Sequence, residues 1–148
     1  MDDIVYIPKS MVIEQHNYVI DKSGGSHGIY SEKDGLLDSI LEHIQNNDYF
    51  PSFLDKLNKL LIGIAEYHIF IDGNKRTAIS IGALFLKLNG FSDNIISRFM
   101  CEMENYIIWV TEHRISEELF QNKLEYIIYD IDEPEEFRFK IIRILSSN

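Results

Sequence analysis

Apolar residues recur every three or four positions through most of this 148-residue chain, and this spacing constrains the fold more than any other feature. Such a period places the apolar side chains on one face of an α-helix. The pattern therefore predicts an all-α, mainly helical and compact fold. It predicts about six helices, at residues 10–21, 31–44, 52–65, 75–89, 93–109 and 116–128. In the first of them, Met11, Ile13 and Tyr18 are expected to face the core.

Residue types that start and stop helices flank these segments. A serine followed three positions later by an acid has the spacing of a capping box, in which both side chains satisfy free amides at the helix start. A single Asp or Ser can also cap a helix through its side-chain oxygen. Glycine after the last turn is a stop signal, because it adopts the left-handed conformation without strain. The expected signals are Ser31 with Asp34, Ser52 with Asp55, Asp93, Ser116 and the stop Asn89–Gly90.

Two terminal segments depart from the helical period. Ile4–Ile7 is a short apolar run, and Phe137–Ile141 alternates apolar and polar residues as a half-buried strand does. The two segments could form a short terminal strand pair. A helical continuation fits the second segment nearly as well, so both alternatives stay open.

Length and composition restrict the class of protein. The length corresponds to one domain, so residues 1–148 are expected to form a single domain, with an acidic C-terminal extension from about residue 130 that forms a solvated turn. The formal net charge of -10 repels phosphate backbones and argues against direct nucleic-acid binding. No apolar run is long enough to cross a membrane, and Cys101 alone cannot form an intrachain disulfide. These features favour a cytoplasmic protein without membrane association.

Residues 68–77, with the sequence HIFIDGNKRT, contain an imidazole, a carboxylate, a turn and two cations. Asp72–Gly73 is a turn dipeptide, so His68 is expected to end one helix and Asn74 to cap the next. Lys75 and Arg76 then lie at the positive end of the helix dipole, where cations are unfavourable unless an anion is bound. A helix N-terminus with two added cations is suited to a phosphate group.

The same residues fit phosphoryl-transfer chemistry. Mg²⁺ typically binds one or two carboxylates plus phosphate oxygens, which suits Asp72. His68 could accept the proton of an attacking hydroxyl. Taken singly, His68 could be a capping or core residue, residues 72–74 an ordinary turn, and Lys75 with Arg76 a solvated surface. Their joint occurrence favours a site, and other phosphate-binding motifs are absent from the sequence.

This stretch resembles the signature of the Fic/Doc family, His-x-Phe-x-Asp/Glu-Gly-Asn-Gly/Lys-Arg, and is closest to the Doc (death-on-curing) toxin branch. Lys75 stands where the adenylylating Fic branch has glycine, and Ile79 stands where that branch has a second arginine. The resemblance covers roughly residues 4–130. It includes further matches at His16, Gly24–Gly25, Gly28–Ile29, Gly35–Leu37 and Leu86–Gly90.

The resemblance implies a Fic fold and a toxin of a toxin–antitoxin pair. Doc-like members direct the γ-phosphate of ATP at a protein hydroxyl, that of elongation factor Tu in the best-understood case, and so arrest translation. By the same resemblance, Phe70 would anchor the loop in the core, and Ser23–Tyr30 would be either a flap that holds the target segment or a mobile glycine loop. The implied roles are catalytic for His68, Asp72 and Arg76, Mg²⁺-binding for Asp72, and ATP-binding for Gly73, Asn74, Lys75 and Arg76.

Two alternatives use the same residues. An adenylyltransferase would keep His68 and Asp72 but leave AMP on the target, and a non-catalytic module would bind nucleotide or a partner without needing a base. The sequence lacks the inhibitory Ser/Thr-x-x-x-Glu-Gly/Asn pattern of self-restrained Fic proteins. We therefore expect inhibition by a separate antitoxin, through an amphipathic segment that docks beside the first two helices and that is basic, or at least not acidic.

Overall fold

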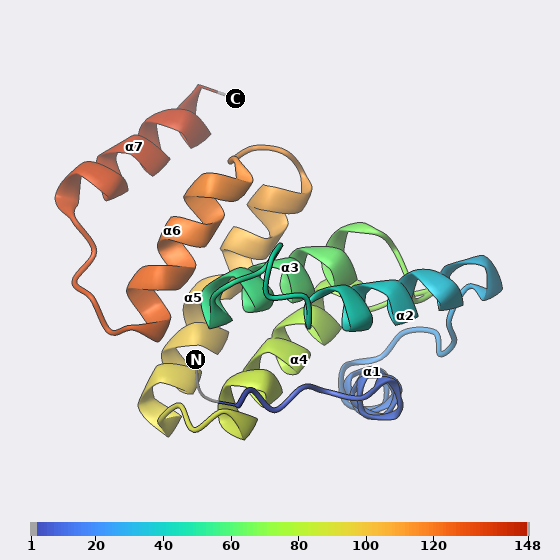
Figure 1. Cartoon of the computed structure of the whole chain (residues 1–148). Helices are drawn as coiled ribbons and strands as arrows, with labels where there is room; N and C mark the ends of the chain where they lie inside the picture. The colour runs from blue at the N-terminus through green and yellow to red at the C-terminus, as the bar shows by residue number, and fades with distance from the viewer. Residues whose placement is uncertain (1–2, 148) are drawn as a thin grey trace.

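The computed structural model describes residues 3–147, so residues 1, 2 and 148 of the predicted domain lie outside it. Within that range the chain is all-α, as predicted, and its only β-type pairing is one isolated bridge (Figure 1). A seventh helix follows the six expected ones. The helices are α1 (Lys9–Ser23), α2 (Asp34–His43), α3 (Phe53–Glu66), α4 (Asn74–Leu88), α5 (Asp93–Thr111), α6 (Glu117–Ile128) and α7 (Glu135–Ser146), with a 3₁₀ turn at Ser31–Lys33.

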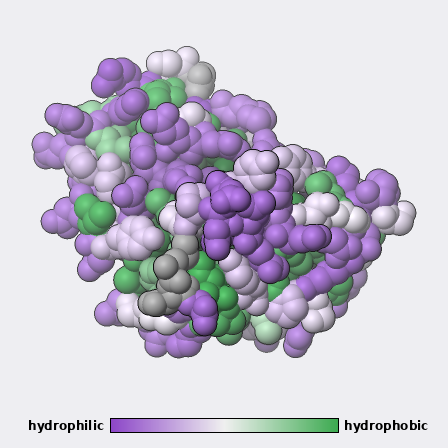
Figure 2. All heavy atoms as spheres, viewed as in Figure 1, coloured by the Kyte–Doolittle hydropathy of each residue, from purple (hydrophilic) through white to green (hydrophobic). Residues whose placement is uncertain are grey.

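Helices α3 and α4 pack against each other at the centre of the molecule. Helix α5 covers α4, α6 packs on α5 and α3, and α1 lies across α4 beside α2. Figure 1 shows α1 and α7 at opposite ends of this assembly. The face seen in Figure 2 is mostly hydrophilic, with apolar residues scattered over it. None of the helices within residues 3–147 has the length and apolar character needed to cross a membrane.

Two of the five expected helix caps are confirmed, and the outcome for Asn74 is given with the site below. Ser52 and Asp55 form the capping box of α3, and Ser116 accepts from the Leu119 amide at 3.1 Å. The box at Ser31 is wrong, because residues 31–33 form a 3₁₀ turn and α2 starts at Asp34 without a side-chain cap. Asp93 is also not a cap. Ser92, one residue earlier, has the extended backbone that a cap requires and accepts from the Ile95 amide at 3.3 Å.

The buried face of α1 differs from the predicted one. Val12, His16 and Ile20 are buried, whereas Met11 and Ile13 are only partly covered and Tyr18 is 57% exposed. The buried residues are spaced by four and form one row that packs on α4 and on the segment before it. A histidine therefore occupies a position in the apolar row, and the hydrophobic pattern alone pointed to the wrong side of the helix.

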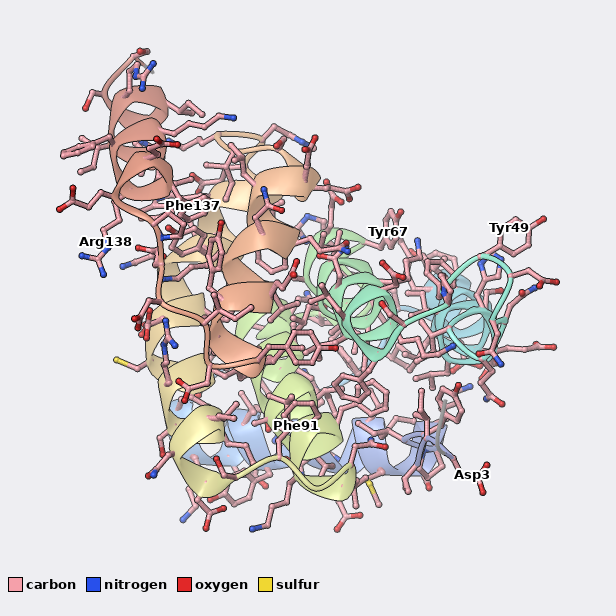
Figure 3. The ribbon with its side chains drawn as sticks, turned by 60° about the vertical axis from the view of Figure 1, so that its left-hand side comes forward. Asp3, Tyr49, Tyr67, Phe91, Phe137 and Arg138 are labelled. Atoms are coloured by element: carbon pink, nitrogen blue, oxygen red, sulfur yellow. The ribbon has the colours of Figure 1, made fainter. Side chains whose placement is uncertain are left out.

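The terminal strand pair is wrong. Residues 137–141 belong to α7, which begins after Pro134 and buries Phe137 and Ile141, four residues apart, on one face. Phe137 packs edge-on against the Tyr126 ring of α6, and Figure 3 shows it at the start of α7. The segment 4–7 is extended but unpaired with any strand. The Asn89 side chain, at the expected stop of α4, donates to the Val5 carbonyl and accepts from the Val5 amide.

The acidic segment 130–136 is mostly solvent-exposed, as expected, with one exception. Glu133 has a side chain only 8% exposed and binds Lys123 at 2.6 Å and Arg138 at 2.8 Å. Lys123 of α6 also binds Glu102 of α5 at 2.7 Å. This acid therefore fastens the segment before α7 to the helical body rather than facing solvent.

Candidate active site

Residues 67–73 connect α3 to α4 and contain the first half of the predicted site. The chain leaves α3 through His68, whose φ of 50° is left-handed. Glycine or asparagine usually occupies this position after a helix, because other side chains are strained there. The His68 side chain is exposed and forms no hydrogen bond or ion pair within residues 3–147. Among residues 3–147, the structure thus presents an imidazole without a partner at a strained helix end, next to Tyr67, which Figure 3 labels.

Phe70 anchors the connector in the core, as expected, and is 1% exposed. The Asn74 side chain encloses its backbone, since Oδ1 accepts from the Phe70 amide and Nδ2 donates to the Phe70 carbonyl, both at 2.9 Å. Asn74 is therefore the first residue of α4 and not its cap. The cap position is held by Gly73, which offers no side-chain bond.

Gly73 is required at the start of α4 for two reasons. Its φ is +74°, and a Cβ there would lie 2.9 Å from Ile20 Cδ1. The helical hydrogen bonds begin with the Thr77 amide, which donates to the Gly73 carbonyl at 2.9 Å. The amides of residues 74–76 therefore have no helical acceptor, and the first turn contains no acid that would offset the dipole.

Lys75 and Arg76 lie in this first turn, as predicted. Lys75 is half-buried and makes no ion pair within the part of the chain that the structure describes. Arg76 is exposed, and its Nη2 lies 3.7 Å from Asp72 Oδ1. The free amides and the two cations make this helix start an electropositive surface suited to an anion.

The Asp72 carboxylate lies beside this surface and is about half exposed. Its Oδ1 accepts from the Gly73 amide at 2.8 Å, and its Oδ2 accepts from the Ser26 amide at 3.2 Å. Backbone donors thus orient both oxygens while leaving them accessible. Of the predicted residues, the structure brings Asp72, Gly73, Asn74 and Arg76 together, while Lys75 and His68 flank them.

The glycine loop Ser23–Tyr30, which we call the flap, lies against this site. The flap pairs with the connector in one antiparallel bridge. The Ile71 amide donates to the Gly28 carbonyl at 3.0 Å, and the Tyr30 amide donates to the Ile69 carbonyl at 3.1 Å. Arg76 Nη1 donates to Ser23 Oγ, and it also donates to the Gly24 carbonyl oxygen at 3.0 Å. The flap's own polar groups therefore engage the carboxylate and the guanidinium of the candidate site.

His16 is a residue of this site that our chemical analysis of the sequence missed. It is 1% exposed, its Nε2 lies 2.7 Å from the Asp72 carbonyl oxygen, and its ring stacks on Phe70 with centroids 3.9 Å apart. Burial lowers the pKa of His16 below its ordinary value, although the bond to the Asp72 carbonyl acts in the opposite direction. The spacing Val12–His16–Ile20 was the available signal, because it places one histidine in an apolar row.

Asp72 is the candidate metal ligand, and its surroundings fit Mg²⁺ bound together with a nucleotide. No group of three or more His, Cys, Asp or Glu side chains within residues 3–147 could enclose a metal ion. A single accessible carboxylate beside an anion-binding helix start suits an ion whose remaining ligands are phosphate oxygens and water. The described residues therefore fit a Mg²⁺–phosphate complex and not a metal cage built by the protein.

Comparison with known proteins agrees with this geometry. The family model described as the Fic/DOC family matches residues 6–86, more than half of the chain, and includes α1, the flap and the connector. The chain belongs to the Fic/DOC family. It is also similar to the protein named Toxin Doc of Mycolicibacterium smegmatis (strain ATCC 700084 / mc(2)155), with 40% identity over 60 residues that cover 38% of this chain and 46% of that protein. The match spans about half the length of this curated relative. This similarity supports the Doc branch predicted from the signature.

Proposed function

We propose that this chain is a Doc-type toxin that acts as a Mg²⁺- and ATP-dependent protein kinase. It transfers the γ-phosphoryl group of ATP to a hydroxyl of a target protein, which is elongation factor Tu by family resemblance, and so arrests translation. The observation that carries the proposal is the start of α4, where free amides, Lys75 and Arg76 lie in the first turn next to the accessible carboxylate of Asp72.

His68 serves as the general base in this proposal. Its imidazole, which is exposed and has no partner within the described residues 3–147, accepts the proton of the target hydroxyl while that oxygen forms a bond to the γ-phosphorus. The bond from the γ-phosphorus to the bridging oxygen breaks, and ADP leaves. The amides of residues 74–76 with Gly73, Lys75 and Arg76 hold the phosphates. Mg²⁺ on Asp72 would neutralise charge on the transferred group.

Phosphoryl transfer is favoured over AMP transfer by Lys75. In the adenylylating branch this position is glycine, whereas here it is the half-buried Lys75, whose ammonium group makes no ion pair within residues 3–147. A cation in the first turn adds positive charge at a helix start, which favours binding of the more highly charged outer phosphates of ATP.

An antitoxin with an amphipathic segment is the proposed inhibitor, and the net charge of -10 favours a segment that is not acidic. Expression supplies the cellular test. The chain alone should arrest growth of its host, the His68→Ala variant should not, and the product of a neighbouring small gene should restore growth. Unimpaired growth with soluble wild-type protein would contradict the toxin assignment.

Labelled ATP tests the chemistry directly. Purified protein, Mg²⁺ and elongation factor Tu are incubated with ATP labelled at the α or the γ position. We expect label on the target from the γ position alone, and a loss of about 10²–10⁴-fold in rate for His68→Ala. His113→Ala, a matched change at another exposed histidine with positive φ, should keep the wild-type rate.

The other outcomes decide between the alternatives. Transfer of α label would identify an adenylyltransferase. ATP binding without transfer from either position, unchanged by His68→Ala, would favour a non-catalytic binding module.

A further inference from the structure

His16 makes two contacts with the connector, one on each side of Ile71. Its ring stacks on Phe70 with an angle of 7° between the planes, and its Nε2 lies 2.7 Å from the Asp72 carbonyl oxygen. Because a carbonyl oxygen can only accept, Nε2 carries the proton and donates. The bond crosses 56 positions of sequence and joins α1 to the turn before α4.

The acceptor of this bond belongs to the peptide unit that also orients the Asp72 carboxylate. The Asp72 carbonyl and the Gly73 amide are parts of one planar trans unit, in which C=O and N–H point in opposite directions. The Gly73 N–H donates to Asp72 Oδ1 at 2.8 Å. A donor that holds the carbonyl therefore also sets the direction of the N–H that binds the carboxylate.

We infer that His16 is a positioning residue that fixes the Asp72 carboxylate and the start of α4 through the Asp72–Gly73 peptide, without touching substrate. The role in transfer rests on the proposed function, whereas the role in orienting the carboxylate does not. The alternative is that His16 only fills space between α1 and Phe70, and these two roles predict different behaviour of the Gly73 amide.

Two amide variants separate the roles, because they differ mainly in reach. In His16→Gln the side-chain amide nitrogen lies about where His16 has Nε2, so it can still donate to the Asp72 carbonyl. In His16→Asn the amide nitrogen lies near the position of Nδ1, and the side chain is too short to reach that carbonyl. Ser80→Ala is the matched control. It removes the 2.8 Å bond from Ser80 Oγ to Gln15, which also joins α4 to α1 but does not involve the connector. If His16→Asn does not fold, His16→Phe takes its place, since it keeps a ring against Phe70 and lacks the donor.

The first measurement is made on the full chain without ligand. We expect the Gly73 amide to exchange its hydrogen at least tenfold faster in His16→Asn or His16→Phe, and to change less than threefold in His16→Gln and Ser80→Ala. Equal exchange at Gly73 in all four variants would overturn the inference, whatever their thermal stability and whether or not the chain is a kinase.

The second measurement is the Mg²⁺ concentration that half-saturates ATP binding. Loss of an outer partner of a metal ligand typically costs roughly 10–100-fold in affinity, so we expect a rise of that size in His16→Asn and rescue in His16→Gln. An equal Mg²⁺ requirement in wild type and His16→Asn would contradict the functional part of the inference. Absence of ATP binding in the wild type would contradict the proposed function and leave the exchange result to decide the positioning role.

Discussion

At the scale of single residues, His68 combines two features that packing alone does not explain. Its backbone is left-handed, with a φ of 50°, and its side chain is exposed and unpartnered within residues 3–147. The strained conformation of a side chain other than glycine costs on the order of 1–2 kcal/mol. His113 has the same backbone conformation and is also exposed, but it pairs with Glu66, so the imidazole without a partner within residues 3–147 is the feature of His68 that supports the proposed base.

Replacing His68 by glycine separates stability from activity. The glycine relieves the left-handed strain but increases the entropy of the unfolded chain, so we expect His68→Gly to change the free energy of unfolding by between zero and about +1 kcal/mol in favour of the fold. Transfer should fall by about 10²–10⁴-fold. Denaturant unfolding and the labelled-ATP assay measure the two effects.

The matched control is His113→Gly at the end of α5, where φ is 59° and the side chain is 80% exposed. This variant should show a similar change in stability with wild-type transfer. A His68→Gly protein that is several kcal/mol less stable than wild type would instead make His68 a structural residue.

The sequence predicted the connector well because its signals are local. Asp72–Gly73 is a turn by composition, and Lys75 and Arg76 follow directly in the first turn of a helix. The contacts of His16 and the flap with Asp72 span 56 and 46 positions, and neither periodicity nor turn chemistry encodes them. Asn74 shows a different limit, because its bonds to Phe70 span only four positions, and a side chain that suits a cap can equally bind the backbone on the other side of the turn.

At the scale of elements, hydrogen bonds join the flap to Asp72 and to Arg76 of α4. Gly25 allows the flap to approach Asp72, because its φ is +121° and a Cβ there would lie 2.6 Å from Asp72 Oδ2. Gly24 has a φ of +86° and no atom within 4 Å of its Cβ position. A substitution at either glycine would therefore strain the backbone, but only a side chain at Gly25 would also collide with Asp72.

Gly25→Ala should detach the flap from Asp72, and Gly24→Ala should not. We expect the Ser26 amide, which donates to Asp72 Oδ2, to exchange about tenfold faster in Gly25→Ala than in Gly24→Ala, which corresponds to the loss of one hydrogen bond to a charged group. Hydrogen exchange followed by NMR measures this difference. Equal exchange in both variants would show that Asp72 does not hold the flap.

Helix positions followed from periodicity more reliably than helix faces did. The dense apolar row of α3 and the capping box at Ser52 predicted that helix closely. In helix α1 the apolar residues fall into two runs, 11–13 and 18–20, that extend around the helix, so its buried face was set by contacts with α4 and the connector instead. In α7, the FRFKI sequence fits both a strand and a helix, and the burial of Phe137 and Ile141 on one face decides for the helix.

At the scale of the whole molecule, the excess of acids is partly used to hold the C-terminal part in place. Glu102, Glu133, Lys123 and Arg138 form a connected set of ion pairs between α5, α6 and the start of α7. Burial disfavours ionisation of Glu102, but the bonds from Lys123 and Arg98 outweigh it and lower its pKa. The Tyr106 ring lies against this set, with Lys123 Nζ 5.2 Å from its centroid.

Tyr106 makes this region sensitive to alkaline pH. Burial, with the charges of Glu133 and Glu102, raises the pKa of Tyr106 from 10.0 to about 12. A phenol whose pKa is higher in the folded state stabilises the fold below its unfolded pKa, and this contribution is lost as pH rises through the folded pKa. The window is therefore from about pH 10 to about pH 12, and the expected loss of stability is about 1–2 kcal/mol after solvent screening of a partly exposed group.

Denaturant unfolding should show this loss of stability in wild type but not in Tyr106→Phe. In near-ultraviolet absorbance, Tyr106→Phe should lack one of the tyrosines that ionise at high pH in wild type. Tyr49→Phe, at a side chain 70% exposed, should keep the wild-type pH dependence, and a Tyr106→Phe protein with the same alkaline loss as wild type would place the titrating group elsewhere.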